Sequence, residues 1–197
     1  MSRIQALGRD QLSEAQRELY DEILAGPRSG GGSSRGLVDD GGGLIGPFNA
    51  WLHSPELGRR LQAVGESVRF DSSLPSNVLE VGILTVGREW RAQFEWWAHA
   101  RLAARAGVSD DVIDGIRAGE RPEFDDPGEA VAYDFARELL ETRRVGDAAY
   151  DSVVERYGTR GAMDLIAVLG YYVMVSMTLN VFRVALPPGQ DPPFPED

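Results

Sequence analysis

The stretch Glu80–Gly107, EVGILTVGREWRAQFEWWAHARLAARAG, decides the fold that we expect. It places Glu95 and His99 four residues apart in a segment that we expect to be helical, so both side chains lie on one helix face within reach of each other. A carboxylate beside an imidazole in aromatic surroundings suits acid–base chemistry, because the carboxylate fixes the imidazole tautomer. Pairs with this spacing are also common surface contacts, so the alternative is a Glu95–His99 contact that has only a structural role.

Glu80 adds a geometric condition to this pair. It interrupts a segment that is otherwise apolar nearly all round, so we expect a central helix and a buried carboxylate that is paired or neutral. Fifteen positions separate Glu80 from Glu95, which is roughly 22 Å along one continuous helix. They meet only if the chain turns within Gly87–Arg91. We therefore expect two antiparallel helices, Pro75 to about Gly87 and about Ala92 to Ala106.

The rest of the chain also has the periodicity of helices, and no segment shows strand alternation between hairpin turns. We expect an all-α fold with about eight helices. The further expected helices are Gln11–Ala25, Gly46–Leu52, Pro55 to about Arg69, Ser109 to about Gly119, Gly128–Arg144, Gly146 to about Tyr157 and Gly161–Leu186.

The composition divides the 197 residues into three parts. Residues 1–45 hold an N-terminal helix and a flexible glycine-rich loop, residues 46–187 form the helical domain, and residues 188–197 are a proline-rich tail, expected to be extended. Residues 29–43, SGGGSSRGLVDDGGG, cannot pack a core. They contain no phosphate-binding motif, so we expect a flexible loop, with a lid over a pocket as the alternative.

Charge and composition exclude several classes of protein. Twenty basic residues against 31 acidic ones give a net charge of −11, which argues against nucleic-acid or anionic-membrane partners. The absence of cysteine excludes disulfides, thiolate metal sites and cysteine redox chemistry, and the absence of lysine excludes Schiff bases. The longest apolar run, Leu165–Met177, is too short to span a bilayer, and no signal peptide is visible. We expect a cytoplasmic protein.

The order Glu80-x(11)-Ala92-x(2)-Glu95-x(3)-His99 resembles the active-site signature of the AhpD-like superfamily. The peroxidase branch has a glutamate, two cysteines in Cys-x-x-Cys and a histidine. Ala92 and Glu95 stand at the cysteine positions here, which excludes a thiol peroxidase. The chain is similar to the cysteine-free branch, the carboxymuconolactone decarboxylase family, which keeps a Glu-x-x-x-His pair.

Further segments resemble that family in the same order, and together they mark residues 46–187 as a carboxymuconolactone decarboxylase-like domain. These segments are Gly46-Pro47-Phe48, Ser54-Pro55-Glu56-Leu57, Ser73-Leu74-Pro75, Gly107-Val108-Ser109, and Gly170-Tyr171-Tyr172 with Asn180. The resemblance implies an all-α homo-oligomer, commonly a trimer or a hexamer. It also implies an active site that is lined by the paired helices and often by a neighbouring subunit. It implies no single substrate.

The first functional hypothesis is a cofactor-independent decarboxylase that acts on a small carboxylated lactone or a β-keto-acid-like substrate. Such an enzyme holds the substrate carboxylate, stabilises an enolate and reprotonates carbon, without a metal or organic cofactor. We assign His99 as the general acid and base. Glu95 is its orienting partner or a second proton carrier, and Glu80 is a relay group behind them.

Arginine and aromatic side chains are the expected substrate-binding residues. Arg88 or Arg91 can hold a carboxylate, because arginine offers a bidentate fork. A salt bridge to Glu80 or Glu89 is the alternative for either arginine. Aromatic residues that wall the pocket, or instead pack in the core, are Phe48, Trp51, Trp96, Trp97 and Tyr172.

Three alternatives remain at this stage. An isomerase, cyclase or hydrolase could use the same Glu95–His99 pair, and the mass of the product would distinguish it. A site for Fe, Mn or Zn could use Glu80, Glu95 and His99, although one histidine with two carboxylates is a sparse ligand set. In a non-catalytic oligomeric binding protein, Glu95 and His99 would be structural polar residues, without proton transfer or metal binding.

Overall fold

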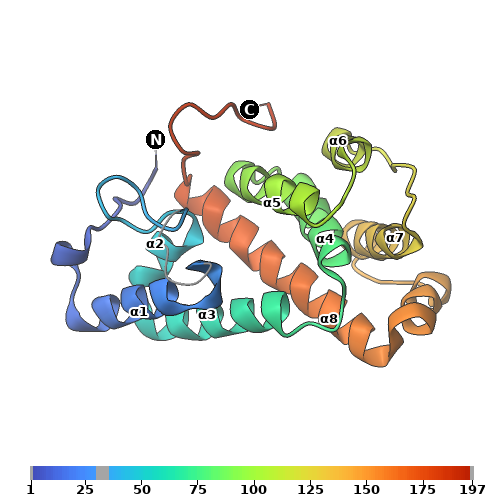
Figure 1. Cartoon of the computed structure of the whole chain (residues 1–197), viewed down its shortest axis with the longest axis horizontal. Coiled ribbons are helices and arrows are strands. Elements are labelled where there is room, and N and C mark those ends of the chain that lie inside the picture. Colours follow the sequence, from blue (N-terminus) through green and yellow to red (C-terminus); the bar gives the residue numbers. More distant parts are fainter. Residues whose placement is uncertain (1, 30–35, 196–197) are drawn as a thin grey trace. The chain divides into compact units, whose positions relative to one another are not determined.

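The computed structural model describes residues 2–29 and 36–195, and the regular secondary structure of this part is helical (Figure 1). Those residues hold eight α-helices and no strand longer than the single bridge between Val38 and Leu44. The helices are α1 (Glu14–Ala25), α2 (Pro47–Leu52), α3 (Pro55–Phe70), α4 (Ser76–Glu89), α5 (Gln93–Arg105), α6 (Asp110–Ala118), α7 (Pro127–Thr142) and α8 (Asp147–Phe182). The predicted all-α fold is confirmed.

The chain forms two compact units. The first contains Met1–Asp71 with Thr178–Ala185, and the second contains Ser72–Met177 with Leu186–Asp197. The domain boundary predicted at residues 45–46 falls inside the first unit and stays a prediction. Part of the glycine-rich segment, residues 30–35, lies outside the described residues, and so does the lid prediction that depends on it.

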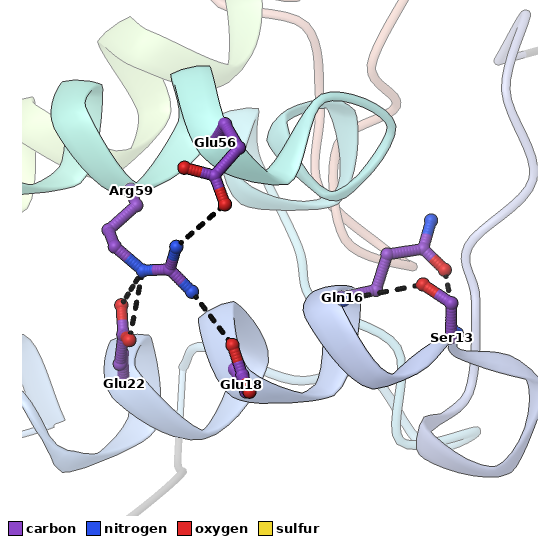
Figure 2. A network of polar contacts seen from close by, with 6 residues as sticks. All are labelled: Ser13, Gln16, Glu18, Glu22, Glu56 and Arg59. Carbon is purple, nitrogen blue, oxygen red and sulfur yellow. Dashed lines mark hydrogen bonds and ion pairs between the residues drawn. The ribbon is translucent and has the colours of Figure 1, made fainter.

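The first unit has a small core between α1 and the segments around it, formed by Leu12, Leu19, Tyr20, Ile23, Leu44 and Leu52. Ser13 begins α1 with a reciprocal cap, in which its side chain and that of Gln16 each bond the other's backbone N–H. On the surface, Arg59 of α3 joins Glu56 to Glu18 and Glu22 of α1, as Figure 2 shows.

Helix α4 is the central element of the second unit. It packs against α5, α6 and α7, and residues 78–87 are all buried. Gly82 brings α4 close to α8, because a Cβ at this position would lie 3.4 Å from Leu165 and 3.5 Å from Leu169. The predicted central antiparallel pair is confirmed as α4 and α5, which start and end within two residues of the expected bounds.

Helix α8 contains a break at Gly158, where φ is 69° and ψ is 177°. The sequence predicts two helices with an interruption near this position, as observed. By length and composition, α8 is the one helix in the described ranges that could cross a membrane. The apolar residues of its inward face, Leu165, Val168, Leu169, Tyr172 and Val175, are buried, which is the pattern of a helix in a protein core.

The C-terminal tail packs along α5. Phe194 is buried and its ring meets Trp96 edge to face, with 5.2 Å between the ring centroids. The side chain of Gln93 accepts from the Phe194 backbone N–H at 3.0 Å and donates to its carbonyl at 2.8 Å. Trp97 and Arg101 both donate to the side-chain oxygen of Gln190. The proline-rich tail is thus anchored at both ends on the helix that carries His99.

Candidate active site

The turn between α4 and α5 brings the predicted site residues together. The Ala92 N–H donates to the Gly87 carbonyl at 2.9 Å and the Arg91 N–H donates to the Arg88 carbonyl at 3.0 Å, which is the pattern of a Schellman motif. Arg91 occupies the left-handed position of this motif, with φ of 45°, where glycine is the usual residue. The motif reverses the chain within three residues, so α5 runs back along α4.

His99 lies between two carboxylates. Its Nδ1 atom is 2.6 Å from Glu80 Oε2, and its Nε2 atom is 3.0 Å from Glu95 Oε1. Glu80 comes from α4, whereas Glu95 is one turn before His99 on α5. All three side chains are at most 7% exposed. The structure therefore brings together the three residues to which the sequence analysis assigns proton transfer.

Each ring nitrogen of His99 thus has one carboxylate oxygen within 3.0 Å. A neutral imidazole donates from one ring nitrogen and presents a lone pair at the other, whereas an imidazolium donates from both. Glu80, Glu95 and His99, called the triad below, therefore have the short separations that proton transfer between side chains needs.

Tyr172 closes one side of the triad. Its ring meets the imidazole of His99 edge to face, with 4.9 Å between ring centroids, and Tyr171 packs on Tyr172 at 5.3 Å. Tyr172 is 4% exposed. The predicted aromatic wall thus has one member in direct contact with His99, and that member comes from α8.

The other predicted aromatic residues have ring partners of their own. Trp96 is buried under Phe194 of the tail. Phe48 and Trp51 belong to the first unit, where their rings pack edge to face at 5.3 Å. Phe194 is not among the residues predicted from the sequence, although it is the one large apolar side chain other than proline in the tail.

The two predicted carboxylate-binding arginines point to different neighbours. The guanidinium of Arg88 lies against Gly119, at the end of α6, and its Nε is buried without a hydrogen-bond partner among the described residues. Arg91 donates to the Pro195 carbonyl of the tail at 2.6 Å. Substrate binding by either one stays a prediction.

The described residues contain no group of three or more histidine and carboxylate side chains arranged to hold a metal ion. The geometry of the triad gives a reason. Glu80 and Glu95 face different nitrogens of the same ring, and those two nitrogens point in different directions. One ion cannot take both carboxylates and a ring nitrogen in this arrangement.

Solved structures similar to this chain share its fold. One is an uncharacterized peroxidase-related protein with an alkylhydroperoxidase AhpD core from Ralstonia eutropha JMP134. It superposes with a TM-score of 0.73 over 95% of this chain and 93% of its own, at 15% identity. The chain has the AhpD-like fold.

Two structures of the debrominase Bmp8 support the same assignment of an AhpD-like fold. A cysteine-to-alanine variant in complex with 2,3,4-tribromopyrrole superposes with a TM-score of 0.68 at 12% identity, and the apo protein with 0.68 at 11%. Each comparison covers 90% of both chains. No family model matches the sequence, and no curated protein matches it. The AhpD-like fold is therefore shown, and the narrower decarboxylase family remains a proposal.

Proposed function

We propose that the protein is a cofactor-independent acid–base enzyme that decarboxylates a small carboxylated lactone or a β-keto-acid-like substrate. The observation that carries this proposal is the buried imidazole of His99 with a carboxylate oxygen at each ring nitrogen. Such a triad can give a proton to carbon and take one back, which is the part of the reaction that needs a protein group.

The reaction balances without a redox partner. The bond between the substrate carbon and its carboxylate breaks, CO2 leaves, and the electron pair moves into the neighbouring carbonyl or conjugated lactone as an enolate. The triad then protonates the carbon and regains a proton from water. The net change is the replacement of a carboxylate by one proton.

The geometry suggests distinct roles for the two carboxylates. Glu80 makes the shorter contact with His99 and comes from the neighbouring helix, so it holds the ring in one orientation. Glu95 lies 3.0 Å from Nε2 and is the carboxyl group that exchanges the proton with the substrate. His99 transfers the proton to Glu95 and stabilises whichever carboxylate is charged.

Arg88 is the proposed anchor for the substrate carboxylate. It is half-buried on α4, and its buried Nε has no hydrogen-bond partner among the described residues. A guanidinium in that state can pair with a carboxylate on arrival of a ligand. Arg91 is the weaker choice, because it already donates to the tail.

Isomerisation, cyclisation or hydrolysis on the same site is the second candidate function. The position of Glu95 beside His99 supports this second candidate as well. A Glu95 carboxylate can remove a proton from carbon as readily as its acid form can return one. The same fold is found in a protein named a debrominase and in one described as peroxidase-related, so the fold alone does not select decarboxylation. This chain has no cysteine, so a route through its own thiolate is closed to it.

Self-association is part of the proposal. Large apolar side chains on α8 are exposed in the single chain, at 60% for Met163, 45% for Ile166 and 43% for Met177. A second copy would cover them, and we propose a trimer or a hexamer. Ile166→Glu should then lower the molar mass measured by light scattering, whereas Ser152→Glu on the same helix should not. An unchanged mass in Ile166→Glu contradicts the use of this face.

Carbon dioxide release tests the decarboxylase proposal. Wild type, His99→Ala and His53→Ala are assayed with γ-carboxymuconolactone and several β-keto acids. His53 is the matched control, because it is the other histidine and is exposed at the end of α2. We expect release by wild type and His53→Ala and loss in a folded His99→Ala, with one deuterium in the product made in D2O.

Two results would contradict the proposal. Release that persists in His99→Ala would remove the triad from the proton path. No release by wild type from any of these acids would end the decarboxylase proposal for them, and the mass of any product formed would then decide between isomerisation, cyclisation and hydrolysis.

A further inference from the structure

Ser176 is a buried hydroxyl without a partner. Its residue exposure is 0%, and none of the described residues forms a hydrogen bond with its Oγ. Helical serine and threonine commonly bond the carbonyl four residues earlier. Thr85 does so with Val81 at 2.7 Å and Ser152 with Ala148 at 2.8 Å. Ser176 is therefore different from these other helical hydroxyl groups.

Ser176 belongs to the face of α8 that meets the paired helices. Leu165, Leu169, Tyr172 and Ser176 follow one another at intervals of four, three and four residues, which is one stripe of a helix. Leu165 and Leu169 lie next to Gly82 of α4, and Tyr172 meets His99 of α5. Ser176 extends this stripe by one turn.

The direction of the helices places that turn on the Glu95 side of His99. Leu74, just before α4, approaches Gly161 of α8, and Gly82 approaches Leu165 and Leu169, so α4 and α8 run in parallel. Because α5 returns along α4, it runs antiparallel to α8, in agreement with Figure 1. A step from Tyr172 to Ser176 therefore has the same direction as a step from His99 to Glu95, and each is about 6 Å long.

A buried hydroxyl without a partner reduces the stability of the protein in which it stands. The cost is recovered when a ligand supplies the missing oxygen atom. We propose that Ser176 is a substrate-binding residue, whose hydroxyl donates a hydrogen bond to the carbonyl oxygen of the bound acid next to Glu95. That oxygen gains negative charge in the enolate, so the donor acts where charge develops. This assignment rests on the proposed function.

The test compares Ser176→Ala with Thr85→Val, a buried hydroxyl that already has its partner. In the ligand-free protein, Ser176→Ala should raise Tm by about 2–4 °C, because it removes an unpaired polar group, and Thr85→Val should not. In the CO2 assay with γ-carboxymuconolactone, kcat/KM should fall about tenfold in Ser176→Ala and stay unchanged in Thr85→Val.

The two measurements separate this inference from the proposed function. A lower Tm in Ser176→Ala, or an equal rise in both variants, would contradict the claim that the Ser176 hydroxyl lacks a hydrogen-bond partner in the ligand-free protein. This holds whatever reaction the protein catalyses. A raised Tm with unchanged kcat/KM would overturn the binding role. If wild type releases no CO2, the decarboxylase proposal fails, and the Tm comparison decides whether Ser176 is an open donor.

Discussion

His99 and Glu80 touch across the α4–α5 pair, with 2.6 Å between Nδ1 and Oε2, although 19 positions separate them in the chain. Both side chains are 7% exposed. The contact thus joins two helices inside the protein by a hydrogen bond, whereas residues 78–87 around Glu80 on α4 are otherwise nearly all apolar.

Glu80→Ala should lower the free energy of unfolding by about 3 kcal/mol, because removal of one member of a buried hydrogen-bonded pair leaves the other without its partner. Urea denaturation measures the change. Glu18→Ala is the control, since Glu18 pairs with Arg59 on the surface and is 60% exposed. It should leave stability nearly unchanged. Equal changes in the free energy of unfolding for the two variants would show that the buried contact stabilises the protein no more than the surface ion pair.

Two carboxyl groups at the start of α7 should respond to pH in opposite directions. Burial raises the pKa of Glu129 above its ordinary 4.5, an effect that the hydrogen bond from Asn77 only partly offsets. The backbone N–H of Gly128, helped by Asn77, holds the pKa of Asp126 below its ordinary 3.8. Stability from Glu129 is therefore full below pH 4.5 and is lost as pH rises through the raised pKa. Stability from Asp126 is present above pH 3.8 and is lost as pH falls.

Urea denaturation at about pH 4 and pH 7 checks the signs. From the lower to the higher pH, Glu129→Gln should gain stability relative to wild type, because glutamine stays neutral. Between about pH 5 and pH 3, the deficit of Asp126→Asn should shrink, because the wild-type carboxylate becomes protonated. A Glu129→Gln difference that does not depend on pH would contradict the raised pKa.

Two glycines with open space around them should give opposite results on substitution by alanine. A Cβ built on Gly107 or on Gly170 has no atom within 4 Å, apart from atoms of the adjacent residues and of the local helix backbone. Gly107 has φ of 96°, so Gly107→Ala should lower stability by about 1–2 kcal/mol. Gly170 lies inside α8, and Gly170→Ala should raise stability by about 0.5–1 kcal/mol. Thermal unfolding of both variants measures the difference, and a stabilised Gly107→Ala would contradict the backbone argument.

Phe194→Ala should release the tail from α5. The Phe194 N–H donates to Gln93, and its ring covers Trp96. Loss of the ring should speed amide hydrogen exchange at residues 190–195 and shift tryptophan fluorescence to longer wavelength. Asp191→Ala, a change at an exposed residue of the same tail, is the control. Unchanged exchange in Phe194→Ala would mean that the backbone bonds alone hold the tail.

The paired helices could be predicted because the expected contact between Glu80 and the Glu95–His99 pair requires the chain to turn between them. Only a chain reversal brings Glu80 to Glu95, and the observed turn lies within the expected residues. The local signal was modest because an arginine, Arg91, takes the left-handed position that glycine usually marks. The contact of Glu80 with one ring nitrogen and Glu95 with the other depends on side-chain conformations, which spacing alone does not determine.

The packing of the tail on α5 could not be predicted. The segment PPGQDPPFPED lacks helical or strand periodicity, so its composition indicates only an extended chain. Its position is set by contacts between residues about a hundred positions apart, such as Gln93 with Phe194. For the same reason, the sequence does not reveal that Arg91 donates to Pro195.

The short separation of Glu80, Glu95 and His99 along the chain also bears on how the protein folds. All three lie within one helical hairpin, α4 to α5, so their meeting closes a loop of 19 positions, from Glu80 to His99. Contacts that are local in sequence form quickly, because little chain entropy is lost before they are made. The triad of Glu80, Glu95 and His99 can therefore assemble early in folding, before the tail docks. Kinetic experiments on Glu80 variants would then show slower folding rather than faster unfolding.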